Sequence, residues 1–500
     1  MRKRWYLLLV LPAAVALLVS QRELRDTKLP ATVRSTEQFA AFLDTLAPQL
    51  LLRYRVPGVC VGLVEGDLDH RGCYGKARSG DGRPLDGRSR FGVASVSKTF
   101  AAMSVLTLAA RGSVGLDDPI ERHLDSWRFP DGRYQASTVT IRQLLTHTAG
   151  VGVASYGGAL STSRAETTRD VLEGRTTGRE PVRLIAPPGS GFRYSGGGYM
   201  VLQLLVEDVA GMPFERFVTE NIFRPLAMRD TSFSWGPGRG TDTTGHDVAG
   251  RRLPTYEYGA AMAPGSMVTT ADDMLRFVSA FANARVARVL QWPEPLWNDY
   301  IAPAQGRYGM GLTIADANGH LVLGHAGTTM GYDAGFTALP GEGTGWFVLA
   351  NGNGGVFLKP ELDRLFLEWK TQSNDPRHGV VKVLRAIVLF LAIVLPAVGG
   401  FLLVSLGFAW AAGRRSFAAV RGSRAFAKAL RTLRAVLVSA VLVFWLVFFH
   451  TDAFYPAFTT AWMPYAFRYV TLGVALFLLR GVLSSIAPRV SETEGSRLKV

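Results

Sequence analysis

The sequence predicts a mixed domain of the α/β or α+β class that lies between apolar segments suited to a membrane. Residues 31–372 alternate helical and strand patterns, with breaks rich in Gly, Pro and Asp at residues 78–90 and 236–244. Residues 386–412 form an uncharged apolar run. The net charge of +15 is gathered at the two ends of the chain. These features predict an enzyme-sized domain followed by transmembrane helices.

The charge distribution argues against a nucleic-acid-binding protein. Residues 1–30 hold 6 Lys/Arg and 2 Asp/Glu, and residues 376–500 hold 15 Lys/Arg and 3 Asp/Glu. The part between them is close to neutral, so no basic face is expected on the folded domain. Basic residues beside apolar segments are instead typical of membrane topology signals.

Residues 1–25 have the layout of an export signal. Three basic residues, Arg2, Lys3 and Arg4, precede an apolar run at residues 7–19. No small-residue cleavage site is clear at residues 16–20, so a cleaved signal sequence and an uncleaved membrane anchor both fit. In either case the domain that follows is expected to be exported.

Residues 382–488 are predicted to form a membrane region of two or three helices. The run at 386–412 is long enough to cross a bilayer, and the seven basic residues that follow predict a cytoplasmic loop. Residues 435–451 are a second uncharged stretch. A third, at 469–486, must accommodate Arg480, whose long side chain can reach the interface. Buried core helices are the alternative, but core helices rarely show this charge pattern.

The sequence contains two cysteines, Cys60 and Cys73, on either side of a predicted hairpin. If the turn centres on Gly66 and Asp67, the two thiols face each other across the strands and could form a disulfide. Two buried free thiols are the alternative. Two cysteines are too few for a disulfide framework or a metal cluster.

The elements of the central domain follow from the periodicity of the apolar residues. A hairpin is expected at residues 59–64 and 71–74, and later strands at 320–323 and 346–349. Helices are expected at residues 99–110, 200–209 and 271–282.

The stretch with the most reactive side chains is residues 91–100, which leads directly into an apolar helix. Ser95 at a helix start gains from the helix dipole and from free backbone N–H groups. Lys98, three residues later, lies on the same helix face. Burial disfavours the charged form of an amine, so a lysine here could accept the serine proton. The same pattern at Ser496 and Lys499 lies in a polar tail, and Ser97 lacks the three-residue offset.

Two later motifs, with Ser95-x-x-Lys98, resemble the serine β-lactamase and penicillin-binding protein superfamily, in particular its class C-like esterase and D-peptidase branch. The Tyr194-Ser195-Gly196 loop is similar to the family's Tyr-x-Asn element. His325-Ala326-Gly327 is similar to its Lys-Thr-Gly or His-x-Gly strand. The resemblance covers nearly all of residues 40–355. It implies a β-lactamase-like fold, with an antiparallel sheet flanked by helices and a mostly helical subdomain.

The resemblance also implies a role for each matching residue. Ser95 would become acylated, Lys98 would take its proton, and Tyr194 would relay a proton to the leaving group and help to activate the deacylating water. The oxyanion hole would consist of the N–H groups of Ser95 and Thr328, with Gly327 and Gly196 also at the substrate. His325 would border the site and contact the substrate or Tyr194. His147 is interpreted as a structural histidine in a turn that ends a helix.

Two departures from the family pattern bear on the substrate. Gly196 stands where the family usually has an asparagine that binds the substrate amide. His325 stands where many members have a lysine, and histidine carries a charge only part of the time at neutral pH. Both changes favour an esterase, amidase or D-aminopeptidase over a true β-lactamase. The chemistry needs no metal and no organic cofactor.

The sequence therefore predicts a serine hydrolase that is anchored in the bacterial inner membrane, with its catalytic domain outside the cytoplasm. Its expected partners are the lipid bilayer and an ester or peptide substrate, including cell-wall-derived compounds. One alternative is a degenerate hydrolase domain that serves as an exported binding or sensor module. A transporter is a further alternative, but two or three spans without paired intramembrane charges fit it poorly.

Overall fold

The computed structural model describes residues 12–18 and 27–412 and a few positions between 472 and 483. Within 27–412 it leaves out residues 79, 81, 157–158, 161–165, 176–179, 236–240, 249, 258, 303–307 and 374–375. Contacts divide the chain into two units, residues 28–375 and the two ends, 1–27 with 376–500. Most of the expected export signal, the span at 435–451 and most of the span at 469–486 lie outside the described residues.

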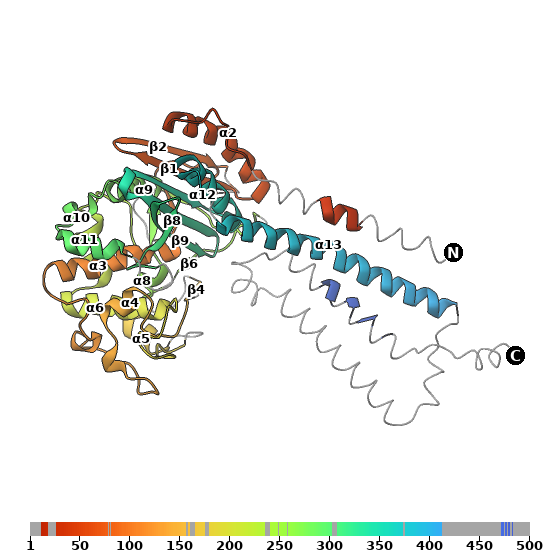
Figure 1. The fold of residues 1–500 in the computed structure, drawn as a ribbon. Coiled ribbons are helices and arrows are strands. Elements are labelled where there is room, and N and C mark those ends of the chain that lie inside the picture. Colours follow the sequence, from red (N-terminus) through yellow and green to blue (C-terminus); the bar gives the residue numbers. More distant parts are fainter. Residues whose placement is uncertain are drawn as a thin grey trace, which may run out of the picture. The chain divides into compact units, whose positions relative to one another are not determined.

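A six-stranded antiparallel sheet forms the centre of the unit 28–375 (Figure 1). Its strand order is β2-β1-β11-β10-β9-β8, so the first strands of the domain pair with the last. The strands are β1 (Gly58–Glu65), β2 (Leu68–Gly75), β8 (Thr313–Ala317), β9 (His320–Thr329), β10 (Tyr332–Leu339) and β11 (Thr344–Ala350).

Helices cover both faces of the sheet. Val59, Val61 and Leu63 of β1 pack into one core with α2 (Thr36–Tyr54) and α12 (Gly355–Thr371). The alternate residues Cys60 and Val64 pack into a second core with α9 (Ala271–Ala282). Because successive side chains of a strand point to opposite faces, β1 is buried on both sides.

The second core continues into a mostly helical part that surrounds α3 (Ser97–Ala110), whose residues 97–108 are all buried. The remaining helices of this part are α4 (Ile141–Leu145), α5 (Thr168–Leu172), α6 (Gly196–Ala210), α7 (Phe214–Val218), α8 (Met262–Gly265), α10 (Val286–Val289) and α11 (Glu294–Ile301). The short strands are β3 (Ser89–Gly92), β4 (Ala159–Leu160), β5 (Thr241–Asp242), β6 (Tyr256–Glu257) and β7 (Val268–Thr270). The predicted fold class is confirmed.

The strand β9 extends beyond the range predicted from periodicity and includes the His-x-Gly motif, for which the family resemblance implied a strand. The expected strand at residues 320–323 continues to Thr329 and so includes His325 and Gly327. The Gly-rich extension has low intrinsic strand propensity, but it pairs with β10 from Leu323 to Thr329. Tertiary pairing therefore overrides local preference at this strand.

The helix α13 (Pro376–Ala411) contains the apolar run expected to cross a membrane. Its residues 389–411 have a mean hydropathy of 2.5. By length and composition this segment is able to span the hydrocarbon core of a bilayer.

The structure joins Cys60 and Cys73 in a disulfide between β1 and β2. The two residues are direct partners in the ladder, as a turn at Gly66 and Asp67 predicts. Of the two alternatives left open by the sequence, the structure has the disulfide.

Loss of this disulfide is expected to destabilise the domain. For a sequence separation of 13, closing the loop removes chain entropy from the unfolded state worth about 3 kcal/mol. We expect the double variant Cys60→Ala/Cys73→Ala to unfold at lower denaturant concentration than the full-length wild type. The reduced wild type serves as the control and should match the variant. Equal stability of the oxidised and reduced wild type would contradict the prediction.

Candidate active site

Ser95 lies in a 3-10 turn, η2 (Ala94–Val96), which connects β3 to α3. The preceding residue, Ala94, has a φ of 45°, a left-handed conformation that costs a non-glycine residue about 1–2 kcal/mol. The Ser97 hydroxyl stabilises this turn, because it donates to the Ala94 carbonyl at 2.6 Å and accepts the Met267 N–H at 3.0 Å. Ser97 is thus engaged in structure, whereas Ser95 borders open space.

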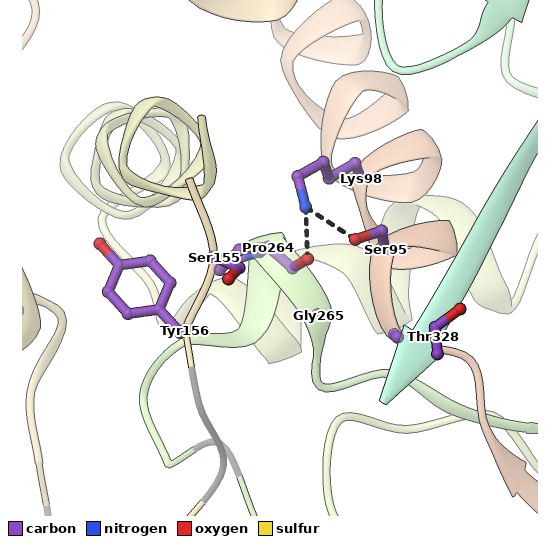
Figure 2. A pocket seen from close by; sticks show the side chains of 8 residues that line it. Ser95, Lys98, Ser155, Tyr156, Pro264, Gly265 and Thr328 are labelled. Atoms are coloured by element: carbon purple, nitrogen blue, oxygen red, sulfur yellow. Dashed lines mark hydrogen bonds between the residues drawn. The ribbon is translucent and has the colours of Figure 1, made fainter. Parts of the chain in front are cut away.

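Lys98 lies one turn after Ser95 in α3 and is 2% exposed. Its Nζ is 3.2 Å from Ser95 Oγ and donates to the Pro264 carbonyl at 2.6 Å, as Figure 2 shows. The Tyr194 ring lies beside it, with Nζ 4.9 Å from the ring centroid. In the part of the chain that the structure describes, no carboxylate pairs with Lys98. The surroundings therefore offer a polar but uncharged site for the amine.

Tyr194 is held in the loop before α6. The Ser195 side chain caps α6 by accepting the Gly198 N–H at 2.9 Å, and its hydroxyl donates to the Gly152 carbonyl at 2.7 Å. These bonds fix the backbone directly after Tyr194. The half-buried Tyr194 ring can therefore stay beside Lys98.

His325 lies on β9 with both ring nitrogens engaged. Nδ1 lies 2.7 Å from the Ala326 carbonyl, which can only accept, so Nδ1 carries the proton. Nε2 then accepts the Tyr308 hydroxyl at 3.0 Å. Burial lowers the pKa of His325 to about 3. His325 is therefore a neutral imidazole whose hydrogen-bond partner is Tyr308 rather than the expected Tyr194.

Gly327 lets β9 approach the Ser95 turn. A Cβ at this position would lie 2.1 Å from the Val93 carbonyl oxygen and 2.7 Å from Ser95 N. Any side chain would push β9 away from the Ser95 turn. The motif therefore requires a glycine at this position for steric reasons.

Thr328, the next residue of β9, turns its hydroxyl away from Ser95 (Figure 2). The hydroxyl donates to Asp333 Oδ2 at 2.6 Å. Burial raises the pKa of Asp333 to about 6, and the Thr328 hydroxyl and Lys359 act in the opposite direction. The Thr328 side chain is therefore fixed, and only its backbone faces Ser95.

Two cavities meet at Ser95 and Thr328. The larger, of about 330 Å³, is also lined by Phe192, Tyr194, Tyr308, Thr313, His325, Ala326 and Gly327. The smaller, of about 50 Å³, is also lined by Ala94, Lys98, Ser155, Tyr156, Pro264 and Gly265 (Figure 2). The cavities thus bring together all the predicted site residues except Gly196.

Gly196 lies in the first turn of α6, outside the walls of both cavities. Its N–H donates to the Ala154 carbonyl at 2.9 Å. A Cβ there would lie 3.4 Å from the Tyr156 ring. The Tyr156 ring thus borders the space into which the family's asparagine side chain would project. Sequence reasoning assigned Gly196 to the substrate, but the structure does not bring it to the cavities.

Sequence reasoning missed Tyr308, Tyr156 and the position of His147. The bond of Tyr308 to His325 joins separate segments of the chain, so no local pattern indicates it. His147 packs against Tyr194 and Tyr308, with ring centroids 4.3 and 4.7 Å apart. Nothing in the local pattern marks Tyr156.

Among the described residues, no three His, Cys, Asp or Glu side chains gather into a metal-binding group.

Two curated proteins are similar to part of this chain. The esterase EstB of Burkholderia gladioli is 34% identical over 275 residues, which cover 48% of this chain and 69% of the esterase. The penicillin-binding protein 4* of Bacillus subtilis is 31% identical over 193 residues, which cover 38% of this chain and 40% of that protein.

Solved structures show the same fold. The octameric penicillin-binding protein homologue from Pyrococcus abyssi superposes with a TM-score of 0.58 at 21% identity, covering 69% of this chain and 81% of that one. The D-amino acid amidase from Ochrobactrum anthropi gives 0.53 at 23% identity, covering 69% and 98%.

The family model described as Beta-lactamase matches residues 36–368, which include the whole sheet, α3 and both cavities. The two curated relatives are named as an esterase and a penicillin-binding protein. This chain accordingly belongs to the Beta-lactamase family and is a serine hydrolase.

Proposed function

We propose that this protein is a membrane-anchored hydrolase that transfers the acyl group of a neutral ester or amide first to Ser95 and then to water. One observation carries the proposal. The amine of buried Lys98 lies 3.2 Å from Ser95 Oγ, where the two cavities meet. A hydroxyl beside a buried amine is the arrangement that activates a weak nucleophile.

In the acylation step, Lys98 acts as the base that accepts the Ser95 proton as Oγ bonds to the carbonyl carbon. The carbonyl oxygen becomes an oxyanion, stabilised by the N–H groups of Ser95 and Thr328. The bond to the leaving group then breaks, and the leaving group takes the proton through Tyr194. In deacylation, water attacks the carbonyl carbon of the acyl-enzyme ester on Ser95 and loses its proton to Tyr194 and Lys98. The acid leaves and Ser95 recovers its hydrogen.

Tyr194 and His325 have different parts in this scheme. Tyr194 lies against Lys98 and lines the large cavity beside Ser95, so its phenol can reach the leaving group. His325 is neutral, and its Nε2 lone pair is occupied by Tyr308. We therefore assign His325 to shaping the cavity and orienting Tyr308 rather than to proton transfer.

The lining of the large cavity favours a neutral, apolar acyl or leaving group. Phe192, Tyr194 and Tyr308 supply three aromatic rings, and among the described residues that line this cavity there is no lysine or arginine. A substrate carboxylate there would lose its hydration without gaining an ion pair. The relative that is named as an esterase supports an ester as the substrate. Penicillins and peptides ending in a free carboxylate should therefore be poor substrates.

Two features support a location outside the cytoplasm at a membrane. Disulfides such as Cys60–Cys73 persist mainly in oxidising compartments. The helix α13 follows the catalytic domain and contains a segment long and apolar enough to act as an anchor.

The test compares substrates that differ by one charge. We expect the full-length protein in detergent to hydrolyse p-nitrophenyl butyrate with a kcat/KM at least about 10-fold higher than mono-p-nitrophenyl succinate, since a lost charge-assisted hydrogen bond is worth roughly 1.5–3 kcal/mol. Nitrocefin should be hydrolysed more slowly still.

Comparable turnover of nitrocefin and the butyrate ester would overturn the proposed substrate class. A protein that neither hydrolyses the ester nor reacts with a fluorophosphonate probe would instead be a binding or sensor module.

A further inference from the structure

His147 lies directly behind the candidate site, although its sequence suggests only a turn that ends a helix. It follows α4 in the left-handed region, with a φ of 59°, and is 2% exposed. A bulky non-glycine residue in this conformation is uncommon and often marks a local requirement.

The backbone and side chain of His147 bond on both sides of Tyr194. The His147 carbonyl accepts the Arg193 N–H at 2.7 Å. The ring Nδ1 accepts the Ser195 N–H at 3.1 Å. The ring itself packs on Tyr194, with centroids 4.3 Å apart. One residue therefore binds the N–H of the residue before Tyr194, the N–H of the residue after it, and the Tyr194 ring itself.

These contacts define the protonation state of His147. Since Nδ1 accepts a backbone N–H, the single proton of the neutral ring is on Nε2. Burial lowers the pKa of His147 well below its usual value. A protonated ring would turn Nδ1 into a donor facing another donor. The neutral ring is thus required for the contact with Ser195.

We infer that His147 is a positioning residue that holds the Tyr194 phenol beside Lys98 through its Nδ1 acceptor and its ring face. The inference rests on the proposed function, in which Tyr194 transfers protons. It assigns no direct contact with substrate to His147, which does not line either cavity. Its effect should appear in the chemical step rather than in substrate binding.

Three substitutions at residue 147 distinguish the role of the Nδ1 acceptor from the role of the left-handed backbone conformation. In His147→Asn, the amide oxygen lies at about the place of Nδ1, and asparagine tolerates the left-handed region. In His147→Gly, the conformation is relaxed but the acceptor is lost. In His147→Gln, an acceptor is present but one bond further out. A residue needed only for the turn would be replaced best by glycine.

We expect His147→Gly and His147→Gln to lower kcat for p-nitrophenyl butyrate by about 10–100-fold with little change in KM, since a small misplacement of a reacting group costs up to about 100-fold. His147→Asn should remain within a few-fold of the full-length wild type. Activity of His147→Gly equal to the wild type, or of His147→Asn as low as His147→Gly, would overturn the inference.

A second measurement does not depend on activity. The ¹⁵N shifts of the His147 ring in the full-length protein should show a protonated Nε2 and an unprotonated Nδ1 that stay unchanged from pH 8 to pH 5. An imidazolium at pH 5, or a proton on Nδ1, would contradict the contact with Ser195. If the wild type were inert to the ester, the proposed function would fail, while the ring shifts would still decide whether the Nδ1 contact exists.

Discussion

Replacing Ser95 with alanine is expected to lower kcat for p-nitrophenyl butyrate by about 10⁴-fold or more, as loss of the nucleophile does in other serine hydrolases. Oγ of Ser95 is the hydroxyl next to Lys98 Nζ, and it faces both cavities. Alanine removes this atom but leaves the backbone donors of the turn. The measurement is steady-state hydrolysis together with labelling by a fluorophosphonate probe, both of which should be lost.

Ser104→Ala is the matched control for this substitution. Ser104 lies in α3, the helix that follows the Ser95 turn; it is buried and donates to the Phe100 carbonyl at 2.9 Å. It is remote from the cavity linings, so its loss should leave hydrolysis and labelling intact. Labelling that persists in Ser95→Ala would contradict the proposed nucleophile. Labelling lost in Ser155→Ala would then point to that other hydroxyl in the smaller cavity.

Replacing Lys98 is expected to have the second largest effect, a loss of about 10²–10⁴-fold in kcat/KM, typical of a general base. Lys98→Met keeps the length and apolar stem of the side chain but removes the amine. Lys98→Arg keeps a cation that cannot lose its proton. Because the proposed role needs a neutral nitrogen, both variants should lose activity to a similar extent, as measured by hydrolysis and by the rate of fluorophosphonate labelling.

The comparison between the two Lys98 variants decides the role of the amine. If Lys98 only supplied positive charge, Lys98→Arg would retain near-wild-type rates and Lys98→Met would not. Thermal melting provides the control for folding, since both variants also lose the native bond to the Pro264 carbonyl. Wild-type rates in Lys98→Arg would contradict proton transfer by Lys98.

Features that depend on short-range geometry could be predicted from the sequence. The three-residue offset places Lys98 beside Ser95 because a helix turn brings these positions together. The spacing of Cys60 and Cys73 about a turn predicted that they face each other, as the ladder shows. The apolar run at 386–412 predicted a long helix, and α13 includes it to Ala411.

Contacts that join distant segments could not be predicted in the same way. His325 was expected to contact the substrate or Tyr194; it lines the large cavity, and its Nε2 bonds to Tyr308, a partner that the sequence did not indicate. Gly196 was placed at the substrate, but its turn faces Tyr156 instead. Both outcomes depend on how loops pack, and the local pattern carries no information on packing between loops.

The sequence by itself determined the chemistry of the protein: a serine, a lysine, a tyrosine and a histidine in the order and spacing of one family, next to segments suited to a membrane. The tertiary structure alone decided how these groups are held. It placed His147 against Tyr194, with a hydrogen bond to the Ser195 N–H. It also directed the Thr328 hydroxyl to Asp333, and it buried His325 so that the ring is neutral. The physical reason is that residue type and helix or strand period fix only near neighbours, whereas burial and hydrogen-bond pairing depend on segments far apart in the chain.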